Sequence, residues 1–96
     1  MQRFKYKIVP TTRFKRDIKT LKKRDAELSL LNEVIATLAS GKTLPAKHKD
    51  HALKGSRSGY RDCHILDDWV LIYKIDKGAL ILLLSETGTH SDLFRK

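Results

Sequence analysis

The sequence predicts an α+β fold in which a helical hairpin packs on one side of a small antiparallel sheet, in the order β-α-α-β-β-β. Two observations lead to this fold class. Apolar residues recur at helical spacing in two consecutive segments of the first half, and the second half contains three strand-like runs joined by short polar links. Ninety-six residues provide one core and room for one site, so we expect residues 1–96 to form a single domain.

The first half contains one predicted strand and two predicted amphipathic helices. Residues 4–9 alternate in polarity up to Pro10, which is typical of a short strand with one wet face. The threonine pair that follows can cap a helix with a narrow apolar stripe, formed by Phe14, Ile18 and Leu21. After a break near Asp25, a second helix keeps one apolar face until Gly41, through Leu28, Leu31, Val34, Ile35 and Leu38.

The second half begins with a predicted long loop, residues 40–59, which is rich in Gly, Lys, His and Ser. Loops of this length are often functional, and disorder is the alternative. Three strand-like runs follow at residues 60–66, 69–75 and 79–85, with short links that imply antiparallel hairpins. The second and third runs are almost continuously apolar, so we expect both faces of these strands to be covered, or nearly so. The strand order stays open.

The positive charge of the chain is concentrated in its first quarter. Residues 1–24 hold ten Lys and Arg against the single acid Asp17, and acids and bases balance in the rest, so this quarter carries the whole formal charge of +9. On the first helix these cations mostly face solvent: Arg13, Lys15, Arg16, Lys19, Lys22 and Lys23. Such a surface attracts nucleic acid, an anionic membrane or an acidic protein, and composition does not choose among them.

The cellular location follows from apolar runs and cysteine usage. The longest wholly apolar run, residues 79–84, is far shorter than the ~20 residues that span a bilayer, and the N-terminus does not resemble a signal peptide. We therefore expect a soluble cytoplasmic protein with no membrane partner. The single Cys63 cannot form an internal disulfide, which fits a reducing compartment, and it is expected to be a strand residue.

All four histidines lie in the second half of the chain. They come from different elements, and a sheet can bring three of them to one edge: His51, His64 and His90. Strand alternation makes Asp62 a neighbour of His64 on one face and turns Cys63 and Ile65 toward the core.

Imidazoles in this arrangement suit the cleavage of RNA. A side chain with an ordinary pKa of about 6.5 can both remove the proton of a 2′-hydroxyl and protonate the departing 5′-oxygen, while a nearby cation stabilises charge on phosphorus. Two histidines, a carboxylate and Arg or Lys suffice without a metal or other cofactor. The alternatives are histidines with structural roles, or a metal site that uses His48-x-x-His51 with His64 and His90. No Cys pair or His-Glu-x-x-His pattern supports the metal site.

The aromatic residues of this half have two interpretations. Trp69 opens a strand, where a core or edge anchor is the simpler role. Leu93 and Phe94 can pin a short helical end that follows the turn-forming Gly88 and a possible Thr cap. Aromatic faces also suit unpaired bases, so base stacking on Trp69 or Phe94 is the alternative.

Four motifs in the second half resemble the YafQ branch of the RelE/ParE toxin superfamily. They are His51-Ala-Leu-Lys-Gly55, Gly59-Tyr-Arg-Asp-Cys-His64, Asp68-Trp-Val-Leu-Ile-Tyr-Lys74, and Thr87-Gly-Thr-His90 with Leu93-Phe94. The first half agrees with this family in layout only. The resemblance implies a RelE-like microbial ribonuclease fold and a type II toxin-antitoxin toxin, which inhibits translation by cutting mRNA on the ribosome as a metal-independent endoribonuclease.

The resemblance also implies roles for individual residues. The catalytic set is His51, His64, Asp68 and His90, and the supporting residues are Asp62, Trp69, Phe94 and Arg61. As a hypothesis, His90 protonates the leaving oxygen, and His51 or His64, held by Asp62 or Asp68, removes the 2′ proton. The chain departs from some relatives in carrying Glu86 where they have Arg, which shifts phosphate binding, if it is needed, to Arg61, Arg57 or Lys54.

The implied partners are mRNA, the ribosome and a cognate antitoxin. RNA is expected to contact the basic first quarter together with Lys54 and Arg57, and operator DNA only indirectly through the antitoxin complex. An acidic or amphipathic antitoxin segment is expected to cover the basic or the catalytic surface. Two rivals remain: a non-catalytic ParE-like toxin that acts on DNA gyrase, against which the histidine set argues, and a basic nucleic-acid or protein-binding module. The module predicts that charge reversal on the first helix abolishes activity while His90→Ala has no effect.

Overall fold

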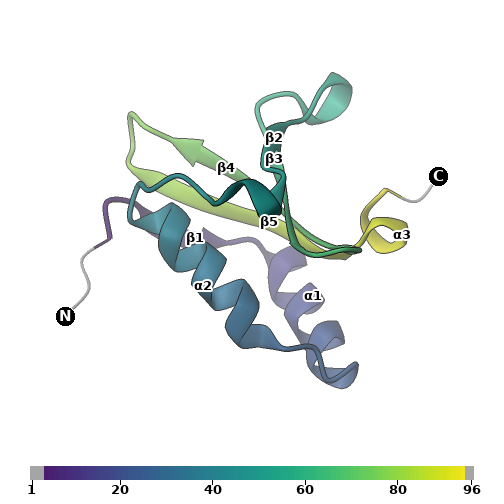
Figure 1. Ribbon diagram of the computed structural model, residues 1–96. Coiled ribbons are helices and arrows are strands. Elements are labelled where there is room, and N and C mark those ends of the chain that lie inside the picture. The colour runs from purple at the N-terminus through teal and green to yellow at the C-terminus, as the bar shows by residue number, and fades with distance from the viewer. Residues whose placement is uncertain (1–3, 95–96) are drawn as a thin grey trace.

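The computed structural model describes residues 4–94 and places two helices against one face of a five-stranded sheet (Figure 1). Residues 1–3 of the predicted basic segment and residues 95–96 of the predicted domain lie outside the described residues. The elements are β1 (Lys7–Pro10), α1 (Thr12–Lys23), α2 (Leu28–Ala39), β2 (His51–Ala52), β3 (Arg61–Leu66), β4 (Trp69–Asp76), β5 (Ile81–Thr89) and α3 (His90–Leu93). The predicted α+β class is confirmed. Within residues 4–94, no helix is long and apolar enough to cross a membrane.

The two long helices form where their apolar periodicity predicts them. Thr11 caps α1, because its hydroxyl accepts a hydrogen bond from the Phe14 backbone N–H at 3.0 Å. Phe14 and Leu21 are buried and Ile18 packs against the same core. The break between the helices falls at Asp25, which has a positive φ of 55°. The apolar faces of both helices therefore point at the sheet, which confirms the predicted helical hairpin.

The sheet has the strand order β1-β5-β4-β3-β2. Its neighbours pair antiparallel from β2 to β5, as predicted, but β1 pairs with β5 in parallel. The predicted small antiparallel sheet is therefore confirmed for β2 to β5, and β1 adds a parallel pair at the edge. The N-terminal strand and the last strand are far apart in sequence, so no short hairpin fixes their relative direction.

Three element boundaries differ from the predicted ones. Pro10 is the last residue of β1, at an edge position where its missing N–H removes no ladder bond. Residues 40–59 form a structured segment, because they contain β2 and two 3₁₀ turns, η1 (Ala46–His48) and η2 (Gly55–Arg57). Strand β5 continues to Thr89, so Gly88 lies in a strand and not in a turn. A Cβ at Gly88 would lie 3.0 Å from Asp92 Oδ2, so glycine allows α3 to fold back closely.

The sheet is covered on both faces, although unequally. On the helix-covered face, Cys63 and Ile65 are buried with the apolar residues of both helices, as strand alternation predicts. The other face carries a smaller cluster of Val70, Ile72 and Leu93. Strand β4 is therefore buried on both sides, and the face opposite the helices is open to solvent where the smaller cluster ends. The candidate active site lies there.

Candidate active site

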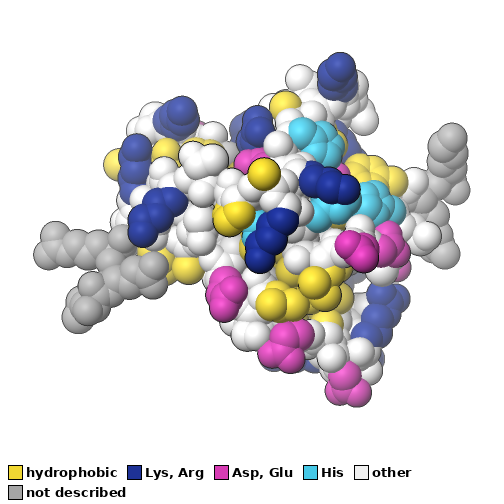
Figure 2. All heavy atoms as spheres, in the orientation of Figure 1, with side chains coloured by type: hydrophobic (Ala, Val, Ile, Leu, Met, Phe, Trp, Pro, Cys, Tyr) yellow, Lys and Arg dark blue, Asp and Glu magenta, His cyan; other side chains and the backbone are white. Residues whose placement is uncertain are grey.

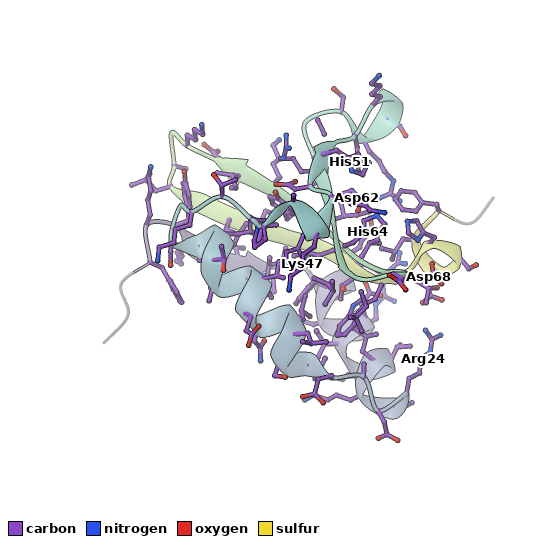
Figure 3. The ribbon with its side chains drawn as sticks, in the orientation of Figure 1. Arg24, Lys47, His51, Asp62, His64 and Asp68 are labelled. Carbon is purple, nitrogen blue, oxygen red and sulfur yellow. The ribbon has the colours of Figure 1, made fainter. Side chains whose placement is uncertain are left out.

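Three histidines come together on the face opposite the long helices. His51 of β2 lies directly across from Asp62 of β3. His64 follows two residues later on the same face, as a diagonal cross-strand neighbour of His51. The ring centroids of His64 and His90 are 5.3 Å apart. Figure 3 shows the labelled side chains of His51, Asp62 and His64 one after another on the way to Asp68, and in Figure 2 the histidines gather on one side of the visible face.

His90 is held by Asp68 at the start of α3. Thr89 caps this short helix in a capping box with Asp92, which fixes the backbone at His90. Asp68 Oδ1 accepts hydrogen bonds from His90 Nδ1 at 2.8 Å and from the His90 backbone N–H at 3.3 Å. The hydrogen bond from the imidazole lowers the pKa of Asp68 below its usual value of 3.8. Because a carboxylate only accepts, Nδ1 carries the proton, and Nε2 is the nitrogen left for proton transfer.

His51 also donates from Nδ1, but to a backbone carbonyl in place of a carboxylate. Its Nδ1 donates to the Lys49 carbonyl oxygen at 2.8 Å, which leaves Nε2 on the side of Asp62, 3.9 Å from Oδ2. Asp62 is only 3% exposed, and no residue of the described part of the chain donates a hydrogen bond to its Oδ1. A buried carboxylate with an unused acceptor therefore lies beside His51.

Asp68 and Asp62 thus serve different histidines. Asp68 contacts His90, the residue expected to act as the acid. Of the two aspartates proposed to hold the base, the geometry therefore favours Asp62 over Asp68. His48 lies apart from the three: its Nδ1 donates to the His64 carbonyl oxygen at 2.6 Å, which ties η1 to β3.

The two predicted aromatics have different surroundings. Trp69 is buried in the helix-side core, and its indole N–H donates to Thr87 Oγ1 at 2.9 Å. It is therefore a core anchor of its strand, the simpler of the two predicted roles, and not an exposed platform for a base. Phe94 is partly exposed, and its ring stacks on His90 at a centroid distance of 5.9 Å. Phe94 therefore lies at the surface of the site, beside His90.

The fold and the motifs match one family. A family model described as "Bacterial toxin of type II toxin-antitoxin system, YafQ" matches residues 6–95. This chain belongs to the YafQ toxin family. It is 42% identical to the mRNA interferase toxin YafQ of Escherichia coli strain K12 over 83 residues, which are 84% of this chain and 87% of that protein. The predicted family is confirmed.

Two solved structures have the same fold. The crystal structure of the Escherichia coli DinJ-YafQ toxin-antitoxin complex contains a chain with a TM-score of 0.86 and 37% identity, covering 94% of this chain and 98% of that one. A crystal structure of a metal-bound toxin from Helicobacter pylori has a TM-score of 0.87 and 39% identity, covering 93% and 99%. These similarities confirm the predicted RelE-like arrangement of helices and sheet.

The cations predicted near the site of this YafQ-family toxin separate into two groups. Arg61 lies on the helix-covered face, because its side chain donates to Asp50 Oδ1 at 3.0 Å and Asp50 also accepts from the Tyr73 hydroxyl at 2.8 Å. This position contradicts the expectation that Arg61 supports the histidines directly. Arg57, in contrast, lies over the Phe94 ring at 5.2 Å. Lys54 is exposed on the same connection.

The basic helix α1 borders the site along β5. Arg13 is occupied by acidic partners, Asp17 at 3.1 Å and Glu86 at 3.6 Å, so it is less available to RNA than predicted. The other predicted cations of α1 are exposed: Lys15, Arg16, Lys19, Lys22 and Lys23.

A contact that the sequence did not predict ties the end of α1 to the site of this YafQ-family toxin. Arg24, labelled in Figure 3, donates to Asp92 Oδ2 at 2.9 Å. This hydrogen bond, together with those of Thr89, lowers the pKa of Asp92 to about 2. The Thr89-x-x-Asp92 spacing identifies the capping box, but nothing local identifies its arginine partner. Helix α3, and with it His90, is therefore anchored to α1.

The prediction of a metal-free site stays a prediction. Within residues 4–94, no group of three or more His, Cys, Asp or Glu side chains is arranged to hold a metal ion. The Helicobacter pylori relative is described as metal-bound. Cys63 is buried, and burial raises the pKa of its thiol, which fits a structural role in β3.

Proposed function

We propose that this chain is an mRNA interferase, a metal-independent endoribonuclease that cuts mRNA on the ribosome and is the toxin of a type II toxin-antitoxin pair. The observation that carries the proposal is the His90 imidazole, fixed by Asp68 with Nε2 left for proton transfer, 5.3 Å from the ring of His64. The Escherichia coli relative bears the name mRNA interferase toxin, which supports the same activity here.

The geometry favours a division of labour between two imidazoles. His90, held by Asp68 through Nδ1, protonates the departing 5′-oxygen from Nε2. His51, beside the buried Asp62, removes the proton of the 2′-hydroxyl, and His64 lies between them to contact the reacting phosphate. The need for a 2′-hydroxyl restricts the enzyme to RNA. Loss of either proton transfer is expected to slow cleavage by roughly 10²- to 10⁴-fold.

The partners follow from the charge and the family. The exposed cations of α1, together with Lys54, contact the phosphates of ribosomal RNA without reading its sequence. The Escherichia coli YafQ toxin is found in complex with DinJ, so a cognate antitoxin that neutralises this chain is proposed as well, with operator DNA bound only through that complex. Residues 1–96 act as one toxin domain in the cytoplasm.

The test is primer-extension mapping of a cellular transcript after brief induction of the protein. Wild type, His90→Ala and the control Lys77→Gln, a charge change on the β4–β5 turn away from the histidines, are compared at matched protein levels. Defined breaks in translated regions are expected with wild type and the control and not with His90→Ala. Growth arrest without breaks, or equal breaks from His90→Ala, would overturn the proposal and favour a gyrase-directed toxin or a binding module.

A further inference from the structure

Arg57 is held in a fixed orientation next to the histidines. Its Nη1 donates to Glu86 Oε2 at 2.6 Å, and its Nη2 donates to the Leu93 carbonyl oxygen at 3.0 Å. Its guanidinium carbon lies 5.2 Å from the centroid of the Phe94 ring, which in turn stacks on His90. A contiguous series of planar groups therefore runs from η2 through Phe94 to His90.

The two hydrogen bonds leave much of the guanidinium free. An arginine side chain has five N–H donors in a rigid fork, and these two bonds occupy only part of it. The side chain is 33% exposed, so part of it is accessible to solvent. A guanidinium with a fixed plane and free donors is suited to bind a phosphate, because its orientation is set before the ligand arrives.

Glu86 lies on the same face of the sheet as Asp62 and His64. It lies across from Ile72, and Ile72 lies across from Asp62, so the three residues form one cross-strand row. The Glu86 side chain is only 13% exposed. Its second oxygen, Oε1, lies 3.6 Å from Arg13 Nη1. One carboxylate therefore faces two arginines, so its single negative charge neutralises the positive charge of Arg57 only in part.

We propose that Arg57 binds a phosphate of the substrate RNA beside His90, and that Glu86 is the positioning residue that holds it there. This inference rests on the proposed ribonuclease function and names the residue of the site that contacts the RNA backbone. A cation at this place brings the backbone within reach of the His90 imidazole and stabilises the negative charge of the phosphate.

The first arm of the test measures binding alone. The affinity of the full chain for a short single-stranded 2′-O-methyl RNA, which has no free 2′-hydroxyl to react, is measured over a range of salt concentrations. Arg57→Met is expected to weaken binding about ten-fold and to reduce the slope of log K against log salt by about 0.7, the value for one phosphate contact on a single strand. Lys77→Gln keeps the wild-type affinity. An unchanged slope in Arg57→Met would overturn the inference, and melting curves of each variant show that it folds.

The second arm measures cleavage of message on translating ribosomes under single-turnover conditions. Glu86→Gln keeps an oxygen that can accept from Arg57 but removes the negative charge, so RNA binding is not weakened. The arginine loses its ion-pair partner and is held less firmly, so the maximal rate is expected to fall about ten-fold. Arg57→Lys keeps the charge without the fork and is expected to bind RNA while cutting slowly. A Glu86→Gln variant that cuts as fast as wild type would contradict the positioning role.

The two arms also separate this inference from the proposed function. His90→Ala is expected to retain the Arg57-dependent salt slope with the 2′-O-methyl RNA and not to cut. If wild type binds RNA with the Arg57-dependent salt slope but cuts no message, the phosphate contact stands and the ribonuclease function fails. If wild type cuts message and Arg57→Met cuts equally well, the function stands and the inference fails.

Discussion

Replacing Asp68 by Asn tests whether the carboxylate that accepts a hydrogen bond from His90 is needed for catalysis. Asn keeps an oxygen that can accept from His90 Nδ1, where the wild-type distance is 2.8 Å, but it removes the negative charge beside the imidazole. Since positioned acid-base groups contribute about 10²- to 10⁴-fold, we expect cleavage to slow by at least about 10²-fold. The side chain of Asp68 is 68% exposed, so the melting temperature is expected to stay close to that of wild type.

The neighbouring residue provides a matched control. Asp67 is an exposed aspartate in the same turn, so Asp67→Asn makes the same chemical change one residue away. The assay is the single-turnover cleavage rate of message on translating ribosomes, measured with melting curves of both variants. Equal loss of activity in the two variants, or wild-type cleavage by Asp68→Asn, would refute the argument that the Asp68–His90 hydrogen bond serves catalysis.

Three further predictions concern the anchoring of the site and the core. The pKa of Asp92 is lowered to about 2 by its hydrogen bonds with Arg24 and Thr89, so these bonds stabilise the fold fully above the ordinary value of 3.8 and are lost as the pH falls to about 2. Urea titrations should therefore show the stability gap between wild type and Asp92→Asn closing over this range. An Asp92→Asn variant with a constant gap would contradict this. Gly88→Ala places a Cβ 3.0 Å from the Asp92 carboxylate, and activity is expected to fall more than stability because α3 must shift; unchanged cleavage would count against it. Leu71→Ala opens a cavity at a residue with no exposed surface and should cost about 2–5 kcal/mol in chemical denaturation, whereas a loss below about 1 kcal/mol would mean that the core collapses around it.

The elements with a repeating pattern could be predicted from the sequence. Helices α1 and α2 have apolar stripes at helical spacing, and the alternation in β3 correctly separates buried Cys63 and Ile65 from Asp62 and His64. These predictions succeed because each depends on neighbours within one or two turns or strand positions. The YafQ motifs added the fold family, since they occur in the right order across the second half.

Contacts between distant elements could not be predicted in this way. The parallel pairing of β1 with β5 joins the two ends of the chain, and the two-residue strand β2 is too short to have a pattern of its own. The partner of His90 lies 22 residues away, and the partner of Glu86 lies 29 residues away. These pairs depend on which strands and turns become neighbours, so the sequence could name the residue types of the site but not assign Asp68 to His90 or Arg57 to Glu86.

The most direct test of the central claim is to determine the chemical ends of the RNA fragments that the purified toxin makes on translating ribosomes. Attack by the 2′-hydroxyl, with His90 protonating the 5′-oxygen, predicts a 2′,3′-cyclic phosphate, or the 3′-phosphate formed from it, on the upstream fragment and a 5′-hydroxyl on the downstream one. A 3′-hydroxyl paired with a 5′-phosphate would mean that water attacks the phosphate, and it would contradict the histidine mechanism.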